Sequence, residues 1–136
     1  MVDFKQLAEQ YKEELLERVL PFWLEHSQDA EFGGYFTCLN RDGSVFDTDK
    51  FIWLQGREVW LFSMLYNKVE KRQEWLDCAI HGGEFLKKYG HDGNYNWYFS
   101  LDRQGNPLYG AQNETYIEGW EKKASNLLIY KRLCKI

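Results

Sequence analysis

The chain carries one short pattern twice, at an offset of 62 to 63 residues. Residues 34–45 read GYFTCLNRDGSV, and residues 97–108 read WYFSLDRQGNPL. In each copy, strand-forming residues lead into a polar turn that contains glycine, which is typical of a β-hairpin. An internal repeat of this length indicates a fold that stacks copies of one supersecondary unit, because a single unit buries too little surface on its own.

Residues 3–25 are predicted to form an amphipathic helix, because apolar side chains recur there at spacings of three and four residues. Asp3 and Gln6 are expected to make a capping box at its start. Pro21 lacks the backbone N–H that the last turn would use, so it is expected to kink or interrupt the helix.

Two further helices are predicted, over residues 50–68 and 72–89. The first is apolar on nearly every side, which is typical of a buried helix, and Asp47, Thr48 or Asp49 is expected to cap it. The second ends in basic residues and then a glycine, as helix C-termini prefer. Its predicted buried residues are Leu76, Ala79, Ile80, Gly83 and Leu86.

The predicted repeating unit is a pair of helices with an aromatic hairpin between them, so the predicted fold class is all-α. Barely two such units fit into 136 residues, whereas a closed ring of helical hairpins needs more. Residues 1–108 are therefore expected to form the opening part of an incomplete α/α toroid. Residues 109–136 turn basic and are expected to be a divergent helical tail, the mark of a truncated or frame-shifted product.

The overall charge argues against a nucleic-acid partner, since 17 basic and 21 acidic side chains leave the chain mildly acidic. No apolar run reaches the roughly 18 residues of a membrane span. The N-terminus also lacks the basic start and apolar core of a secretory signal. We therefore expect neither a nucleic-acid nor a membrane partner.

The cysteines and histidines are scattered and have none of the close spacings of a metal or disulfide site. No metal site is predicted. Unpatterned cysteines in a chain without a secretory signal predict reduced thiols and a cytoplasmic location. The residues concerned are Cys38, Cys78, Cys134, His26, His81 and His91.

A single arginine lies in a segment that is otherwise nearly all apolar. Helical spacing places Trp53, Arg57, Trp60 and Met64 on one face. A guanidinium on a buried helix needs a partner, because an unpaired buried charge is very costly. Arg57 therefore either forms an ion pair inside the core or faces a cavity that holds a polar ligand. Indoles beside a cation with several donors would suit a sugar.

Three motifs in a fixed order carry a family resemblance. They are GGYF at 33–36, CLNRDG at 38–43 and WLQGR at 53–57. With this order and spacing the chain resembles the N-terminal part of the N-acylglucosamine 2-epimerase (renin-binding protein) family. The resemblance implies an (α/α)6 toroid that interconverts N-acetylglucosamine and N-acetylmannosamine.

The implied reaction opens the sugar ring, removes the C2 proton with a base and returns a proton on the opposite face. In the family the proton carriers are histidines in later repeats, beyond the last residue of this chain, so the chain alone is expected to be inactive. Arg57 matches the family's active-site arginine and is predicted to be catalytic. The alternative is a non-catalytic fragment of the same fold that binds a carbohydrate or a protein.

Four further residues are candidates for substrate binding. Trp53 and Trp60 share the face of Arg57 and would stack on the sugar, whereas Tyr35 and Lys50 flank the first hairpin and would reach the mouth of the barrel. Core packing or surface exposure is the other interpretation of each. The resemblance also implies an amino sugar as the small-molecule partner, no cofactor for the chemistry, ATP as an activator, and a homodimer.

Overall fold

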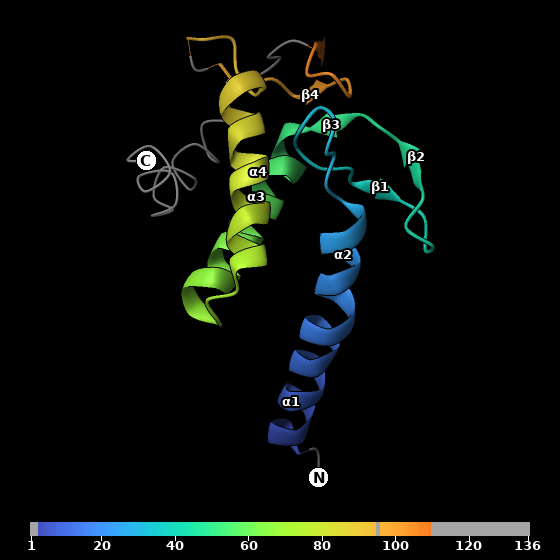
Figure 1. Cartoon of the computed structure of the whole chain (residues 1–136), viewed down its shortest axis with the longest axis vertical. Helices are drawn as coiled ribbons and strands as arrows, with labels where there is room; N and C mark the ends of the chain where they lie inside the picture. The colour runs from blue at the N-terminus through green and yellow to red at the C-terminus, as the bar shows by residue number, and fades with distance from the viewer. Residues whose placement is uncertain (1–2, 95, 110–136) are drawn as a thin grey trace.

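A long N-terminal helical run lies beside an antiparallel pair of helices, and both hairpins lie at one end of this arrangement (Figure 1). The computed structural model describes residues 3–94 and 96–109. The helices are α1 (Phe4–Glu14), the π-helical segment η1 (Leu15–Val19), α2 (Leu20–His26), α3 (Ile52–Lys68) and α4 (Gln73–Tyr89). The strands are β1 (Cys38–Leu39), β2 (Val45–Asp47), β3 (Lys50–Phe51), β4 (Ser100–Leu101) and β5 (Pro107–Tyr109).

The first predicted helix is confirmed as one run, α1–η1–α2, with an irregular turn in it. The Asp3 carboxylate accepts hydrogen bonds from the backbone N–H groups of Lys5 and Gln6, at 3.0 and 3.3 Å, and so caps the start of α1. Pro21 lies in the first turn of α2, directly after the π-helical segment. Because proline cannot donate the usual hydrogen bond, the wider π turn accommodates it without breaking the helix.

The helix predicted from residue 50 begins later and is capped differently. Lys50 and Phe51 form the strand β3, and the Ile52 N–H donates to the Phe99 carbonyl at 3.1 Å. The expected cap from Asp47, Thr48 or Asp49 is therefore wrong. The second hairpin, far along the chain, supplies an acceptor for the first turn of α3, which local sequence reasoning could not foresee.

The prediction that α3 is buried on every side is also wrong for the described part of the chain. One side of α3 packs against α4, whereas Trp53 and Trp60 on the other side are each 44% exposed. Arg57 is exposed as well. The helix is apolar on both sides, but only one of them meets another described element.

The second predicted helix is confirmed as α4, with a buried face shifted from the predicted one. Ala79 and Leu86 are buried as expected, whereas the other three predicted residues are only partly buried. The shift arises because the aromatic ring of Tyr35 lies directly over Gly82. The buried residues of α4 are Trp75, Cys78, Ala79, Gly82, Phe85 and Leu86.

The predicted repeat is confirmed in the backbone, at an offset of 62 residues. Both hairpins are antiparallel, and each has an irregularity in register at the equivalent position. Gly43 and Gly105 take φ angles of +84° and +96° in the two turns, a region that favours glycine. The matching pairs are Cys38–Asp47 with Ser100–Tyr109, and Leu39–Val45 with Leu101–Pro107.

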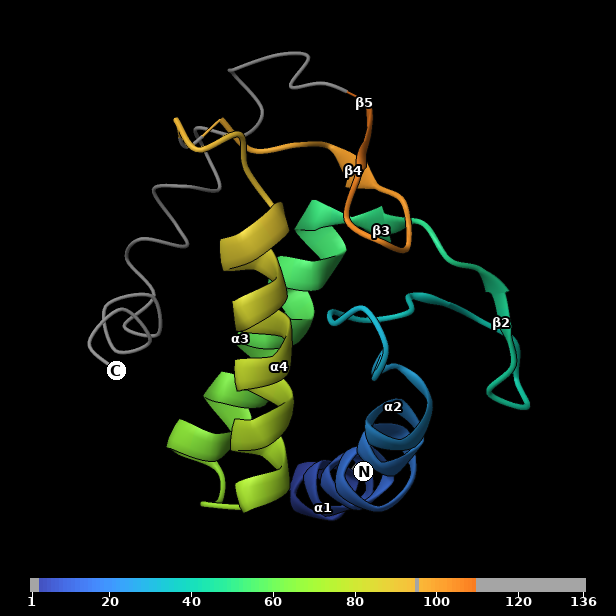
Figure 2. The same cartoon turned by 45° about the horizontal axis from the view of Figure 1, so that its top comes forward.

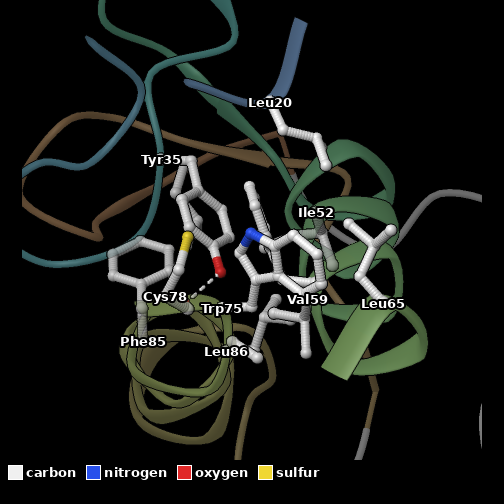
Figure 3. Close-up of a cluster of buried hydrophobic side chains, with 12 residues drawn as sticks. Leu20, Tyr35, Ile52, Val59, Leu65, Trp75, Cys78, Phe85 and Leu86 are labelled. Atoms are coloured by element: carbon white, nitrogen blue, oxygen red, sulfur yellow. Dashed lines mark hydrogen bonds between the residues drawn. The ribbon is translucent and has the colours of Figure 1, made fainter. Parts of the chain in front are cut away.

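The hydrophobic core lies between α2, α3 and α4 (Figure 3). Tyr35 enters it from the loop after α2, and its hydroxyl donates to the Cys78 carbonyl at 2.6 Å. The side-chain amide of Gln55 makes two hydrogen bonds of 2.8 Å with the backbone N–H and carbonyl of the same tyrosine. The loop before β1 is thus joined to both helices of the α3–α4 pair.

The cysteines, the absence of a predicted membrane span and the predicted C-terminal tail can be compared with the described residues. Cys38 and Cys78 are free thiols, while Cys134 lies outside the described residues. No helix among the described residues is long and apolar enough to cross a membrane. The tail predicted over 109–136 also lies outside them, apart from Tyr109.

Two helical glycines give a matched test of this core. A Cβ at Gly82 would overlap the Tyr35 ring, whereas a Cβ at Gly56 meets no atom within 4 Å. We expect Gly82→Ala to lower the free energy of unfolding by roughly 1–3 kcal/mol through overpacking. Gly56→Ala should leave it unchanged or raise it by up to about 1 kcal/mol through helix propensity. Urea unfolding followed by circular dichroism measures both, and equal effects would contradict the placement of Tyr35.

Candidate functional site

The exposed side of α3 brings together three of the predicted site residues. Trp53, Arg57 and Trp60 follow one another at helical spacing, and all three are exposed. The Arg57 guanidinium carbon lies 4.8 Å from the centre of the Trp53 ring, a cation–π arrangement that holds the charge beside the indole. The guanidinium is therefore at the surface of the described structure and not in its core.

This α3 face offers donors and flat apolar surfaces but no proton carrier. The exposed residues of α3 are Trp53, Arg57, Trp60, Asn67 and Lys68, without a carboxylate or an imidazole among them. An arginine presents several N–H donors in a fixed geometry, and indoles present rigid apolar faces. The face is suited to binding and to stabilising negative charge on oxygen, and acid–base chemistry needs groups from elsewhere.

Lys50 is buried and does not reach the surface of the described structure. Its side chain is fully buried, and its ammonium donates to Asp29 Oδ2 at 2.9 Å, to the Gly33 carbonyl at 2.6 Å and to the Arg103 carbonyl at 2.9 Å. These three acceptors use all three ammonium donors. Burial lowers the pKa of Lys50, and Asp29 offsets this only in part. The contacts of Lys50 are those of a structural cation.

Tyr35 is likewise enclosed by the core, with no exposed surface. Burial raises the pKa of its hydroxyl well above the usual range, and the neighbouring Cys78 and Glu58 add to the effect. A phenol that is neutral and bonded to a backbone carbonyl fixes the loop on α4. Trp53, Arg57 and Trp60 are thus brought together on one exposed face of α3. Tyr35 and Lys50, in contrast, are buried in the interior of the described structure.

Asp29, to which the sequence analysis assigns no role, is the centre of a buried ionic cluster. Arg103 donates to both carboxylate oxygens, from Nε at 3.1 Å and from a terminal nitrogen at 3.2 Å. Burial alone would raise the pKa of Asp29, but hydrogen bonds from Arg103 and Lys50 outweigh it and lower the pKa to about 2. The sequence contained no signal for this cluster, because its three members lie far apart in the chain and Arg41, the equivalent of Arg103 in the first hairpin, is exposed.

Glu58 is a second buried acid to which the sequence analysis assigns no role. Glu58 is 9% exposed, and its carboxylate accepts a hydrogen bond of 2.5 Å from the Ser27 hydroxyl. Burial raises the pKa of Glu58 to about 7, although the bond from Ser27 opposes the shift. Burial, with Glu58 nearby, raises the pKa of the Cys78 thiol to about 12, so this thiol is unreactive.

Other places on the described structure do not add to the α3 face. His81 Nε2 lies 2.9 Å from the Gly34 carbonyl, and the His26 ring packs at a tilt against the Phe22 ring. A cleft of about 550 Å³ lies between α2 and α4, and none of the predicted site residues lines it. The described residues contain no group of three or more histidine, cysteine or acidic side chains that could hold a metal ion.

A family model described as N-acylglucosamine 2-epimerase matches residues 34–118, which include both hairpins and the whole of α3. The chain belongs to this family. The match covers more than half of the sequence, and it includes the WLQGR motif, which carries Gln55 and Arg57 and is followed directly by Glu58. Family membership thus rests on the same segment that builds the exposed α3 face.

Among curated relatives, the N-acylglucosamine 2-epimerase of Mus musculus is 47% identical over 120 residues, which are 85% of this chain and 28% of that protein. The cellobiose 2-epimerase of Dictyoglomus turgidum is 32% identical over 109 residues, 79% of this chain and 28% of that protein. The chain therefore spans little more than a quarter of the length of these relatives.

A solved cellobiose 2-epimerase from Bacillus thermoamylovorans matches with a TM-score of 0.70 and 28% identity. The match covers 96% of this chain and 36% of that structure. It confirms the predicted fold class, helix pairs with short hairpins that form part of an (α/α)6 toroid.

The structural role of the Lys50 ammonium in the ionic cluster can be tested. We expect Lys50→Met to lower the free energy of unfolding by about 3 kcal/mol, because three acceptors lose a buried donor. Lys87→Met is the matched control, since Lys87 is exposed on α4 and should change stability little. Urea unfolding of both variants measures the difference. A Lys50→Met variant with an unchanged free energy of unfolding would contradict a structural role for the ammonium.

Glu58 predicts how stability depends on pH. Its folded-state pKa of about 7 is above the ordinary value of 4.5, so its contribution is fully present below pH 4.5 and is lost as the pH rises through 7. The loss amounts to about 3 kcal/mol. We expect Glu58→Gln to flatten the decline in stability between pH 5 and pH 8, measured by urea unfolding. Glu84→Gln, on the exposed side of α4, should keep the decline, and a slope unchanged by Glu58→Gln would assign it to another group.

Proposed function

We propose that this chain is the arginine-bearing part of a sugar 2-epimerase that interconverts N-acetylglucosamine and N-acetylmannosamine. The proposal is supported by identity, which is 47% with the mouse N-acylglucosamine 2-epimerase and 32% with the cellobiose 2-epimerase of Dictyoglomus turgidum. The difference favours the amino-sugar branch over the disaccharide branch. Because the chain spans about 28% of these relatives, the reaction is proposed for the longer protein.

The observation that carries the proposal is the exposed face formed by Trp53, Arg57 and Trp60. Indole faces cover the apolar faces of a sugar ring, and the guanidinium donates to its oxygens. When the C2 proton leaves, negative charge develops on the neighbouring oxygen of the opened sugar. A guanidinium aimed at that oxygen stabilises the charge as it forms, which lowers the barrier to proton removal.

The proton carriers are proposed to come from other parts of the longer protein. Epimerisation requires one group to remove the C2 proton and another to return a proton on the opposite face. The exposed residues of α3 include no group of either kind. The chain by itself is therefore proposed to bind an amino sugar without turning it over, which is also what the alternative, a non-catalytic binding fragment, would do.

The function is tested in a hybrid protein in which this chain replaces the matching portion of the mouse enzyme. Formation of N-acetylmannosamine from N-acetylglucosamine is followed in the hybrid and in the isolated chain. We expect turnover in the hybrid only, and we expect Arg57→Ala to lower its kcat/KM by about 100-fold or more. Lys68→Ala is the matched control, since Lys68 is an exposed cation at the other end of α3.

Two results would contradict the proposal. Full activity of the Arg57→Ala hybrid would remove the arginine from the site, and activity toward cellobiose alone would change the substrate class. Turnover by the isolated chain would contradict the proposal that the proton carriers lie elsewhere. Thermal unfolding of each hybrid shows whether a loss of activity reflects a loss of fold.

A further inference from the structure

The two hairpins are equivalent in the repeat but have different neighbours. In the second hairpin, β3 pairs with the outer edge of β4, with Lys50 opposite Leu101 and Phe51 opposite Ser100. The turn of the same hairpin carries Arg103. The second hairpin is therefore joined on one side to the strand that leads into α3 (Figure 2).

The same hairpin is also joined to an acidic loop of the preceding unit. Arg103 forms ion pairs with Asp29 at 3.1 Å and with Glu31 at 2.9 Å. Its guanidinium also lies over the rings of Phe32 and Phe36, at 5.0 and 5.4 Å from their centres. A strand edge and an arginine thus together hold one unit against the next.

The first hairpin presents the same two features without such neighbours among the described residues. The sheet of β1 and β2 has only two strands in the described structure. At the offset of 62 residues, Arg41 corresponds to Arg103, and it is exposed. No ion pair joins Arg41 to another described residue. In both views the hairpin projects away from the helices (Figures 1 and 2).

We propose that the outer edge of β1 and the guanidinium of Arg41 form a docking surface for another helix–hairpin unit of the same longer protein. The occupant is a unit that brings an extended segment to pair with β1 and an acidic loop to bind Arg41. An unpaired strand edge is a template for pairing with another segment. A guanidinium pairs with a carboxylate through two parallel hydrogen bonds, which gives the contact a defined geometry.

Two observations favour this occupant over a second copy of the chain. The chain covers 36% of the solved cellobiose 2-epimerase, so a full-length relative holds further units that could reach this surface. In a second copy, β3 is already paired with its own β4, and Asp29 is already bound by its own Lys50 and Arg103. The inference concerns assembly of the fold and does not depend on the proposed sugar chemistry.

The test compares arginine variants in the isolated chain and in the hybrid with the mouse enzyme. We expect Arg41→Ala to lower the thermal midpoint of the hybrid by at least about 3 °C and to leave that of the isolated chain unchanged. Arg103→Ala should lower both midpoints, since its partners lie within the chain. Arg18→Ala should change neither much, because the ion pair that Arg18 forms among the described residues, with Glu14, is exposed.

Hydrogen exchange gives a second readout at the strand edge. The backbone amides of residues 37–39 should be more protected in the hybrid than in the isolated chain. Equal protection, or an Arg41→Ala hybrid as stable as the Arg18→Ala hybrid, would overturn the proposal. Formation of a dimer by the isolated chain that Arg41→Ala abolishes would also overturn it, because the occupant would then be a second copy. None of these measurements uses sugar turnover, so they stand whatever the outcome for the proposed function.

Discussion

The buried contact between Lys50, Asp29 and Arg103 is the interaction on which the arrangement of this chain depends. It joins the loop after α2, the strand before α3 and the turn of the second hairpin, which are separated by up to 74 residues in sequence. A buried carboxylate is tolerated only when charges and hydrogen bonds compensate for lost hydration, and here two cations do so. The cluster therefore links the strand that leads into α3 to the loop after α2 and to the second hairpin.

Residues of the motif around Arg57 lie on two sides of α3, some buried and some on the exposed face. Gln55 bonds the backbone of Tyr35, and Glu58 accepts from Ser27, so two polar side chains fix the inner side of α3 to the loop. The residues between and around them, Trp53, Arg57 and Trp60, then point the other way. The buried bonds restrain rotation of the helix about its axis, and this orients the guanidinium and the indoles.

Patterns that depend on local spacing predicted much of the fold. The hairpins, the extents of α1–α2 and α4, and the shared face of Trp53, Arg57 and Trp60 all follow from periodicity and turn residues. The strand β3 and the missing side-chain cap of α3 could not be predicted, because their partners lie far along the chain. The strand β3 pairs with β4, and the Phe99 carbonyl that accepts from Ile52 lies 47 residues beyond it. The roles of Lys50 and Asp29 were missed for the same reason, since a charged residue gives no sign of burial until its distant partners are known.

Comparison of the two copies of the repeat shows that equivalent residues can have different contacts. Arg41 and Arg103 occupy equivalent turns, yet one is exposed and the other is bound to two acids. The two hairpins have the same register and the same left-handed glycine, so their backbones do not cause the difference. What differs is the set of described neighbours, since Arg103 meets Asp29 and Glu31 whereas Arg41 forms no ion pair with a described residue. In a fold of this kind the hairpin is a fixed shape, and its partners are set by the neighbour that the rest of the polypeptide brings to it.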